Sequence, residues 1–200
     1  MLMSDISRFV VGILFLIFFL GCIGGGKMDL RGKKVLMVIA PENFRDEEFM
    51  KPKEILEGSG AEITVASKGV KEATGMFGAK ANVDLDISEV NVDDYDAVIF
   101  VGGTGSSIFF DDSVTISIAK NAYEKGKVVA AICIAPSILA NAGVLEGKNA
   151  TSWPSQKENI EAKGGKYTGE LVTVDGKIVT GRGPDDAEEF GRRIAEILSQ

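Results

Sequence analysis

The sequence predicts an α/β fold, a single domain built as a flavodoxin-like, doubly wound sandwich around a parallel sheet. Short apolar segments of strand length alternate along the chain with longer segments whose apolar residues recur at helical spacing. Strands that are apolar throughout are typical of a parallel sheet covered by helices on both faces. After the glycine spacer Gly24–Gly26 there is no second linker and no internal repeat, so one domain is expected over residues 27–200.

The first half of the domain is expected to contain two strands and a helix. Lys34–Ala40 (KVLMVIA) predicts a fully buried strand, and Glu62–Ala66 (EITVA) predicts the next one. Between them, Asp46–Ser59 carries apolar residues at helical spacing and stops at a Gly-Ser-Gly sequence, which predicts a helix. Pro52 falls inside this helix, and we expect it in the first turn or at a kink, because proline has no N–H to donate.

The second half continues the alternation and ends in a hairpin and a helix. The predicted elements are the strands Ala97–Val101 and Val128–Ile132 with the helix Ser113–Lys125 between them, the strands Leu171–Val174 and Lys177–Thr180, and the amphipathic helix Asp186–Leu198. Asp175-Gly176 favours a type I′ turn between the last two strands. Ligands bind beyond the carboxyl ends of the strands in such sheets, so the loops after Ala40, Val101 and Ile132 should meet at the site.

Composition excludes several classes of function. The chain has 22 Lys and Arg against 29 Asp and Glu, a formal net charge of −7, and no basic cluster, which argues against a nucleic-acid partner. It contains no histidine. Ser-His-Asp and Cys-His catalysis and histidine metal sites are therefore excluded within the chain, and we expect neither a metal nor another cofactor.

The N-terminal segment, residues 1–26, resembles a targeting leader. Phe9–Leu20 is apolar apart from one glycine and follows Arg8, which is typical of a signal sequence and shorter than a transmembrane span of about 20 residues. The sequence Phe-Leu-Gly-Cys ending at Cys22 resembles a lipidation site, so we expect a membrane-tethered protein on the extracytoplasmic face. An uncleaved anchor is one alternative. The other is translation from Met28, which would give a cytoplasmic protein.

Cys133 is the first candidate for chemistry. It follows an apolar strand directly and precedes a segment that begins a helix with Pro136, and the small residues Ala131 and Ala135 flank it as a sharp strand–turn–helix elbow requires. A thiol at a helix N-terminus has a lowered pKa. The alternative is a buried and inert cysteine. Cys22, the other cysteine, lies in the leader, so a disulfide is not expected.

A glycine-rich turn and an acidic helix start are the other candidates. Gly102–Gly105 follows a predicted strand, and its N–H groups, with that of Ile134, could form an oxyanion hole beside the sulfur; the alternative is an ordinary tight turn. Glu48 lies in the first turn of the first helix, where acidic residues usually serve the helix dipole. Because it adjoins Phe49 it should face partly inward, where burial keeps a carboxyl group protonated.

These elements together resemble the ThiJ/PfpI superfamily, which includes PfpI-type cysteine peptidases and the parkinsonism-associated deglycase. The resemblance covers residues 33–200 and rests on KVLMVIAPENFRDEEF, the VGG turn, AAICIAPSILANAGVLEGKNAT and GRGPDDAEEF, in that order. It implies a class I glutamine-amidotransferase-like fold, Cys133 as nucleophile, Glu48 as its partner, Gly103 as an oxyanion donor, and a homo-oligomer, a dimer or larger.

Two positions depart from the family pattern. The peptidases have histidine directly after the nucleophile, where this chain has Ile134, so it is closer to the deglycase branch. That branch has a histidine in a T-x-H-P segment, where this chain has Trp153. An indole stacks or donates a hydrogen bond but cannot shuttle a proton, so Trp153 is expected in the substrate pocket.

Three functions remain open. The first is a cofactor-free enzyme that acts on small electrophiles, either reactive carbonyls or glycated or acyl groups, through a Cys133 thiolate with Glu48 as proton partner. The second is a redox-sensing or protective protein oxidised at Cys133. The third is a membrane-tethered scaffold without chemistry.

Overall fold

The computed structural model describes residues 28–200. The predicted leader and the predicted lipidation of Cys22 lie outside the described residues and stay predictions. Within residues 28–200, no helix is long and apolar enough to cross a membrane.

A seven-stranded sheet forms the centre of the molecule, in the order β11-β12-β8-β7-β1-β3-β6. Its members are β1 (Lys34–Val38), β3 (Glu62–Ser67), β6 (Leu85–Asp86), β7 (Ala97–Phe100), β8 (Val128–Ile132), β11 (Val172–Asp175) and β12 (Ile178–Gly181). All neighbouring strands are parallel except β11, which pairs antiparallel with β12. The predicted parallel sheet is confirmed, with an antiparallel strand at one edge.

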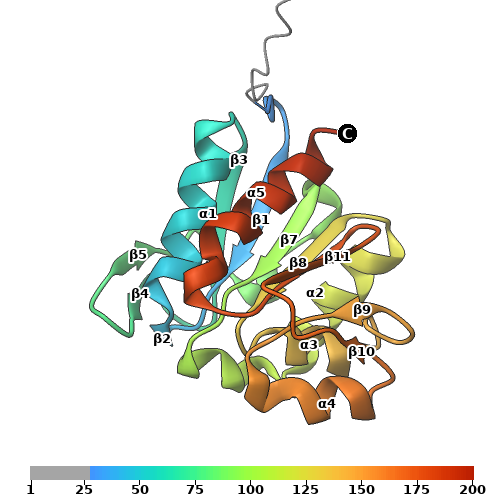
Figure 1. Cartoon of the computed structure of the whole chain (residues 1–200). Helices are drawn as coiled ribbons and strands as arrows, with labels where there is room; N and C mark the ends of the chain where they lie inside the picture. The colour runs from blue at the N-terminus through green and yellow to red at the C-terminus, as the bar shows by residue number, and fades with distance from the viewer. Residues whose placement is uncertain (1–27) are drawn as a thin grey trace, which may run out of the picture.

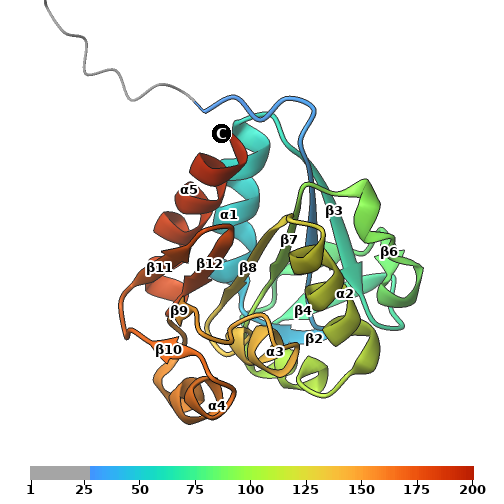
Figure 2. The ribbon, with the colours of Figure 1, turned by 90° about the vertical axis from the view of Figure 1, so that its right-hand side faces the viewer.

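Helices cover both faces of this sheet, as Figures 1 and 2 show. Two helices, α1 (Asp46–Gly58) and α5 (Ala187–Leu198), lie side by side on one face, while α2 (Ser113–Glu124) and α3 (Pro136–Asn141) lie on the other. A short helix, α4 (Lys157–Ala162), packs against α3. The central strands β7 and β8 are buried at every position because both of their faces are covered.

The contact between α1 and α5 explains the proline inside a helix. Pro52 is buried in the middle of α1 and not in its first turn. A Cβ atom added to Gly191 of α5 would lie 2.8 Å from the Cα atom of Pro52, so the two helices approach backbone to backbone there. The proline ring gives up one helix hydrogen bond and contributes buried apolar contact at the crossing.

The turn between β11 and β12 lies one residue later than the sequence predicts. Asp175 pairs with Ile178, so Gly176 and Lys177 are the two central residues. Gly176 has a φ of 62°, whereas Lys177 is not among the residues with positive φ. A type I′ turn needs positive φ at both central residues, so that prediction is wrong: only glycine at the first position takes the left-handed conformation.

A second, small sheet was not predicted. It contains β2 (Glu42–Phe44), β4 (Glu72–Gly75) and β5 (Lys80–Asn82), in the order β2-β4-β5, and a two-stranded sheet pairs β9 (Asn149–Ala150) with β10 (Lys166–Tyr167). These strands are short and half-exposed, so they lack the apolar run that marks the central strands. The small sheet matters for function because β2 leads directly into α1.

Candidate active site

Three loops meet at the carboxyl ends of the central strands. Glu48 comes from the first turn of α1, Gly102 follows β7, and Cys133 follows β8. Gly102 lies between the other two, because a Cβ atom at this position would collide with Oε2 of Glu48 and with Cβ of Cys133. The structure therefore brings the three sequence candidates into contact, and glycine at position 102 is what allows the carboxyl group and the thiol to approach each other.

Cys133 occupies a strained turn. Its φ is 64°, one of only two positive values at non-glycine residues within 28–200. The left-handed conformation is unfavourable for a residue with a Cβ atom and persists where the surroundings fix it. Here the N–H of Cys133 donates to the carbonyl of Gly181 (3.0 Å), and its carbonyl accepts the N–H of Trp153 (2.8 Å). Two neighbouring segments thus hold the elbow in place.

The small neighbours of Cys133 behave as the elbow requires. Ala131 and Ala135 are both fully buried, and the N–H of Ala135 donates to Ile132 at 3.1 Å to close the turn. The helix α3 starts at Pro136 and has six residues. A helix this short provides a weak dipole, so it offers the sulfur only limited electrostatic help.

The thiol of Cys133 has a raised pKa. Burial is the main cause and the charge of Glu48 the second, and together they raise the pKa of Cys133 from 9.0 to about 12. The N–H groups of Gly103 and Ile134 face the sulfur and act on its pKa in the opposite direction. The expected lowering of this pKa is therefore wrong for the free protein, because burial and a neighbouring carboxyl group outweigh the helix and the two N–H groups.

Glu48 is fully buried, and burial raises the pKa of its carboxyl group from 4.5 to about 8. The Cys133 thiol, the positive charge of Arg45 and the N–H of Gly102 lower this pKa in part. Neither carboxyl oxygen makes a hydrogen bond of full geometry. A buried carboxyl group without such partners keeps its proton, so Glu48 is a neutral acid at neutral pH, in the direction that the sequence predicts.

The glycine turn presents its backbone to the sulfur. Gly103 has a φ of 93°, and a Cβ atom there would run into the backbone of residues 43–45, so no other residue fits. The carbonyl of Gly102 accepts the N–H of Arg45 at 3.0 Å, which ties the turn to the start of α1. The N–H groups of Gly103 and Ile134 are thereby held facing the thiol, the arrangement that an oxyanion hole needs.

Trp153 lies beside this site. Its backbone N–H bonds Cys133, its side chain is 46% exposed, and a Cβ atom on Gly183 would lie 3.0 Å from Cε3 of the indole. The ring therefore lies against the turn after β12. The loop that carries Trp153 is attached to β12, since the N–H of Thr151 donates to the hydroxyl of Thr180 at 2.9 Å. Thr180 gives no sequence signal, because threonine is common in strands.

Sequence reasoning also missed Arg45 and Phe77. The guanidinium of Arg45 lies 4.5 Å from the ring centroid of Phe77, which belongs to the turn between β4 and β5. No local pattern links these residues, because they meet only once the small sheet has formed. Within residues 28–200, no group of three or more Cys, Asp or Glu side chains is arranged to hold a metal ion.

Comparisons with known proteins identify the family. Residues 33–197 match the model of the DJ-1/PfpI family. An uncharacterised protein of Methanocaldococcus jannaschii is 40% identical over 86% of this chain and 85% of its own length. A protein of Pyrococcus abyssi named as a deglycase is 35% identical over 82% of this chain and 98% of its own length.

Solved structures show the same fold. The crystal structure of a ThiJ/PfpI domain protein from Brachyspira murdochii superposes with a TM-score of 0.81 at 36% identity, over 84% of this chain and 98% of that chain. That of DJ-1beta from Drosophila melanogaster gives 0.77 at 31% identity, over 84% and 90%. The predicted class I glutamine-amidotransferase-like fold is confirmed. With the order of its motifs, its fold and its sequence in agreement, the chain belongs to the DJ-1/PfpI family.

Proposed function

We propose that this protein is a cysteine-dependent enzyme that acts on small reactive carbonyl compounds or on the glycated groups they form. The observation that carries the proposal is the contact between a buried, protonated carboxyl group, that of Glu48, and the thiol of Cys133. Two relatives named as deglycases, 35% and 33% identical to this chain, support the proposal.

The pair supplies a nucleophile and a proton donor together. When the pair has lost one proton, the tautomer with a Cys133 thiolate and a Glu48 carboxylic acid is the reactive one. The sulfur attacks the aldehyde carbon, a C–S bond forms, and the electron pair of the C=O π bond moves to oxygen. Glu48 then gives its proton to that oxygen, and the product is a neutral hemithioacetal beside a carboxylate.

The backbone and the carboxylate complete the step. The N–H groups of Gly103 and Ile134, which face the sulfur, would stabilise the developing negative charge. The Glu48 carboxylate left by the first step is then a base for the next proton transfer. Since the chain has no histidine, Glu48 is the titratable partner available to the sulfur, which favours carbonyl chemistry over peptide hydrolysis with its poor leaving group.

The test is turnover of a 2-oxoaldehyde such as methylglyoxal, and of a peptide, by the full chain. We expect carbonyl turnover that Cys133→Ser abolishes and Glu48→Gln lowers at least about a hundredfold, the usual contribution of a positioned proton donor. If neither compound is consumed faster by the wild type than by Cys133→Ser, the proposal is wrong.

A second candidate is a protective or sensing role through oxidation of Cys133. The unpartnered oxygens of the neutral Glu48 favour it, because the acid could donate a hydrogen bond to an oxidised sulfur. Mild peroxide should then add two oxygens at Cys133 alone, as read by peptide mass spectrometry. Oxidation of methionines with Cys133 untouched would exclude this role. The homo-oligomer implied by the family stays a prediction.

A further inference from the structure

Arg45 sits where the small sheet meets the active site. Its backbone N–H donates to Gly102, the residue between Glu48 and Cys133. Its side chain leaves the site and reaches the hairpin turn, where the guanidinium lies over the ring of Phe77. Nε also donates to Glu47 at 2.8 Å. The positive charge is thus held by two partners, Phe77 and Glu47. Arg45 is the N-cap of α1 and Glu48 lies three residues later in its first turn, a spacing that places two residues on the same side of a helix.

The hairpin that carries Phe77 is itself fixed to the start of α1. Asp46 is nearly buried, and its carboxylate accepts the N–H groups of Phe77 (3.0 Å) and Ala79 (2.8 Å). The carbonyl of Phe44 accepts the N–H of Met76 at 2.9 Å. The carboxylate of Asp46 therefore fixes the position of the turn that carries Phe77, and with it the ring over which the guanidinium of Arg45 lies.

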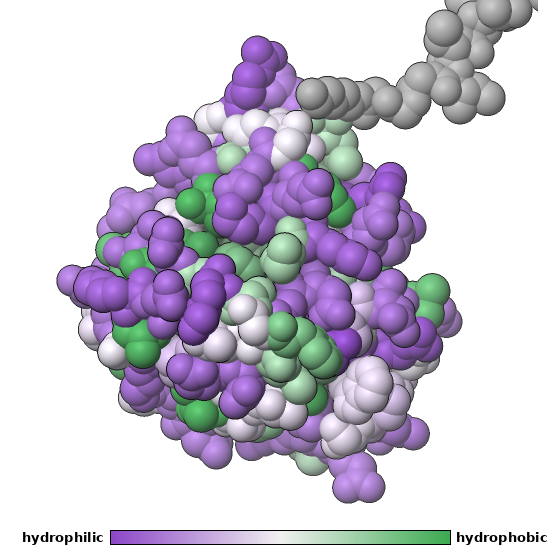
Figure 3. All heavy atoms as spheres, turned by 90° about the vertical axis from the view of Figure 1, so that its left-hand side faces the viewer, coloured by the Kyte–Doolittle hydropathy of each residue, from purple (hydrophilic) through white to green (hydrophobic). Residues whose placement is uncertain are grey.

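The ring of Phe77 lies largely in solvent. Its side chain is 67% exposed, although burying a phenylalanine is favourable. Figure 3 shows the face of the molecule on this side, where small groups of hydrophobic residues are scattered among hydrophilic ones. An aromatic face attracts a guanidinium that lies over it, and it does so even at an exposed site.

We infer that Arg45, held over Phe77 by the hairpin of the small sheet, is a positioning residue that sets the pH at which the Glu48–Cys133 pair loses its first proton. The inference rests on the proposed function, in which Glu48 is the proton partner of the thiol. A fixed positive charge near an acidic pair favours the singly charged state of the pair whichever of the two groups carries the charge, so the effect is the same in sign for both tautomers.

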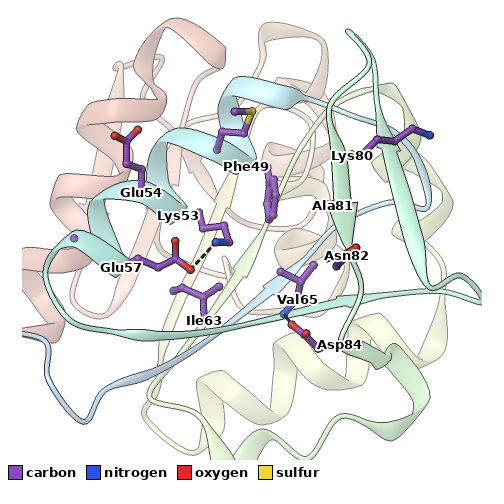
Figure 4. Close-up of a pocket in the computed structure, with 12 residues that line it drawn as sticks. Phe49, Lys53, Glu54, Glu57, Ile63, Val65, Lys80, Ala81, Asn82 and Asp84 are labelled. Atoms are coloured by element: carbon purple, nitrogen blue, oxygen red, sulfur yellow. Dashed lines mark hydrogen bonds and ion pairs between the residues drawn. The ribbon is translucent and has the colours of Figure 1, made fainter.

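The charged groups that act on Glu48 define the controls. They are Cys133 from the turn after β8, and Arg45 and Glu47 from the start of α1; Arg45 lowers the pKa of Glu48 and Glu47 raises it. Lys53 offers a matched cation on the same helix. It pairs with Glu57 in a separate groove between α1, β3 and β5, which Figure 4 shows and whose lining includes neither Glu48 nor Cys133.

The experiment is a pH titration of the Glu48 carboxyl carbon by ¹³C NMR, assigned with Glu48→Gln and run on the full chain without substrate. Arg45→Gln should move the midpoint up by roughly half a pH unit or more at low salt, and high salt should shrink this shift. Glu47→Gln should move it down. Phe77→Ala should give a smaller upward shift, and Phe77→Trp should keep the wild-type midpoint, because it retains an aromatic face.

The outcomes separate the alternatives. Lys53→Gln should leave the midpoint unchanged. The inference would be overturned if Lys53→Gln shifted the midpoint as much as Arg45→Gln does, or if Arg45→Gln left the midpoint unchanged. If Arg45→Gln does not fold, the exposed Phe77→Ala carries the same test. Because no substrate is present, a protein that shows these shifts but turns over no carbonyl compound would disprove the proposed function and leave the role of Arg45 standing.

Discussion

The buried carboxyl group of Glu48 and the partly buried thiol of Cys133 form a pair in which the carboxyl group ionises first. Its pKa is about 8, whereas that of the thiol is about 12. Between these values the pair holds one proton and one negative charge, which belong to both groups. A reactive thiolate therefore arises by transfer of the remaining proton to Glu48, and not by ionisation of an isolated acidic thiol.

Alkylation of Cys133 should reveal this order. We expect the rate of reaction with iodoacetamide to rise with a midpoint near pH 8, because the pair loses its first proton there. In Glu48→Gln this step should vanish and a single step should appear above the ordinary thiol value of 9.0, since burial still raises the pKa of Cys133. A wild-type midpoint near or below about 6 would mean an independently acidic thiol.

Stability should depend on pH through Glu48. Its pKa rises from 4.5 in the unfolded chain to about 8 in the fold, so the native state holds the proton more tightly. This contribution is fully present below pH 4.5 and is lost as the pH rises to about 8. Within that window the free energy of unfolding should fall by up to about 1.4 kcal/mol per pH unit. Urea titrations of Glu48→Gln should lack this slope; a parallel slope would contradict the assignment.

Gly102→Ala should separate the pair. The added methyl group would collide with Oε2 of Glu48, and it would lie 2.5 Å from Cβ of Cys133 and 2.7 Å from the backbone carbonyl oxygen of Ile132, so the backbone itself would have to shift. We expect a loss of stability of about 1–3 kcal/mol and loss of the alkylation step near pH 8. Gly58→Ala is the control, because no atom lies within 4 Å of its added Cβ and its φ is not positive. Equal behaviour of the two variants in denaturation and labelling would disprove the contact.

The backbone strain at Cys133 should be measurable. Its φ of 64° suits glycine better than any residue with a Cβ atom. The free energy of unfolding of Cys133→Gly should therefore exceed that of Cys133→Ala by about 1 kcal/mol, so the glycine variant should unfold at a higher urea concentration. This is the reverse of the usual order of glycine and alanine in helices and strands. Alanine proving the more stable would show that the elbow is not strained.

Fluorescence should report on the site. Trp153 is the chain's single tryptophan, and its backbone bonds Cys133. Formation of a covalent adduct at the sulfur should change the intensity or wavelength of the indole emission, because the half-exposed ring lies next to the site. Cys133→Ser mixed with the same electrophile should give no change at the same concentration, and a change of equal size in that variant would place the effect elsewhere.

The sequence by itself determined the central architecture and the residues that meet. The apolar runs of β1, β7 and β8 and the periodicity of α1 and α5 are local signals, because each element must bury a face whatever its neighbours are. The small residues around Cys133 likewise indicate the elbow without knowledge of the rest. Parallel strands then bring the following loops to one edge, which is why Glu48, Gly103 and Cys133 could be grouped in advance.

Tertiary structure decided what no segment specifies alone. The small sheet was missed because β2, β4 and β5 are short and half-exposed, and each is stable only through the others. The pKa of Cys133 was predicted in the wrong direction, since a helix N-terminus is visible in sequence whereas burial and the position of Glu48 are not. The contact of Arg45 with Phe77 is of the same kind. Local periodicity fixes the elements, but desolvation and charge act through space, between residues that only the complete fold brings together.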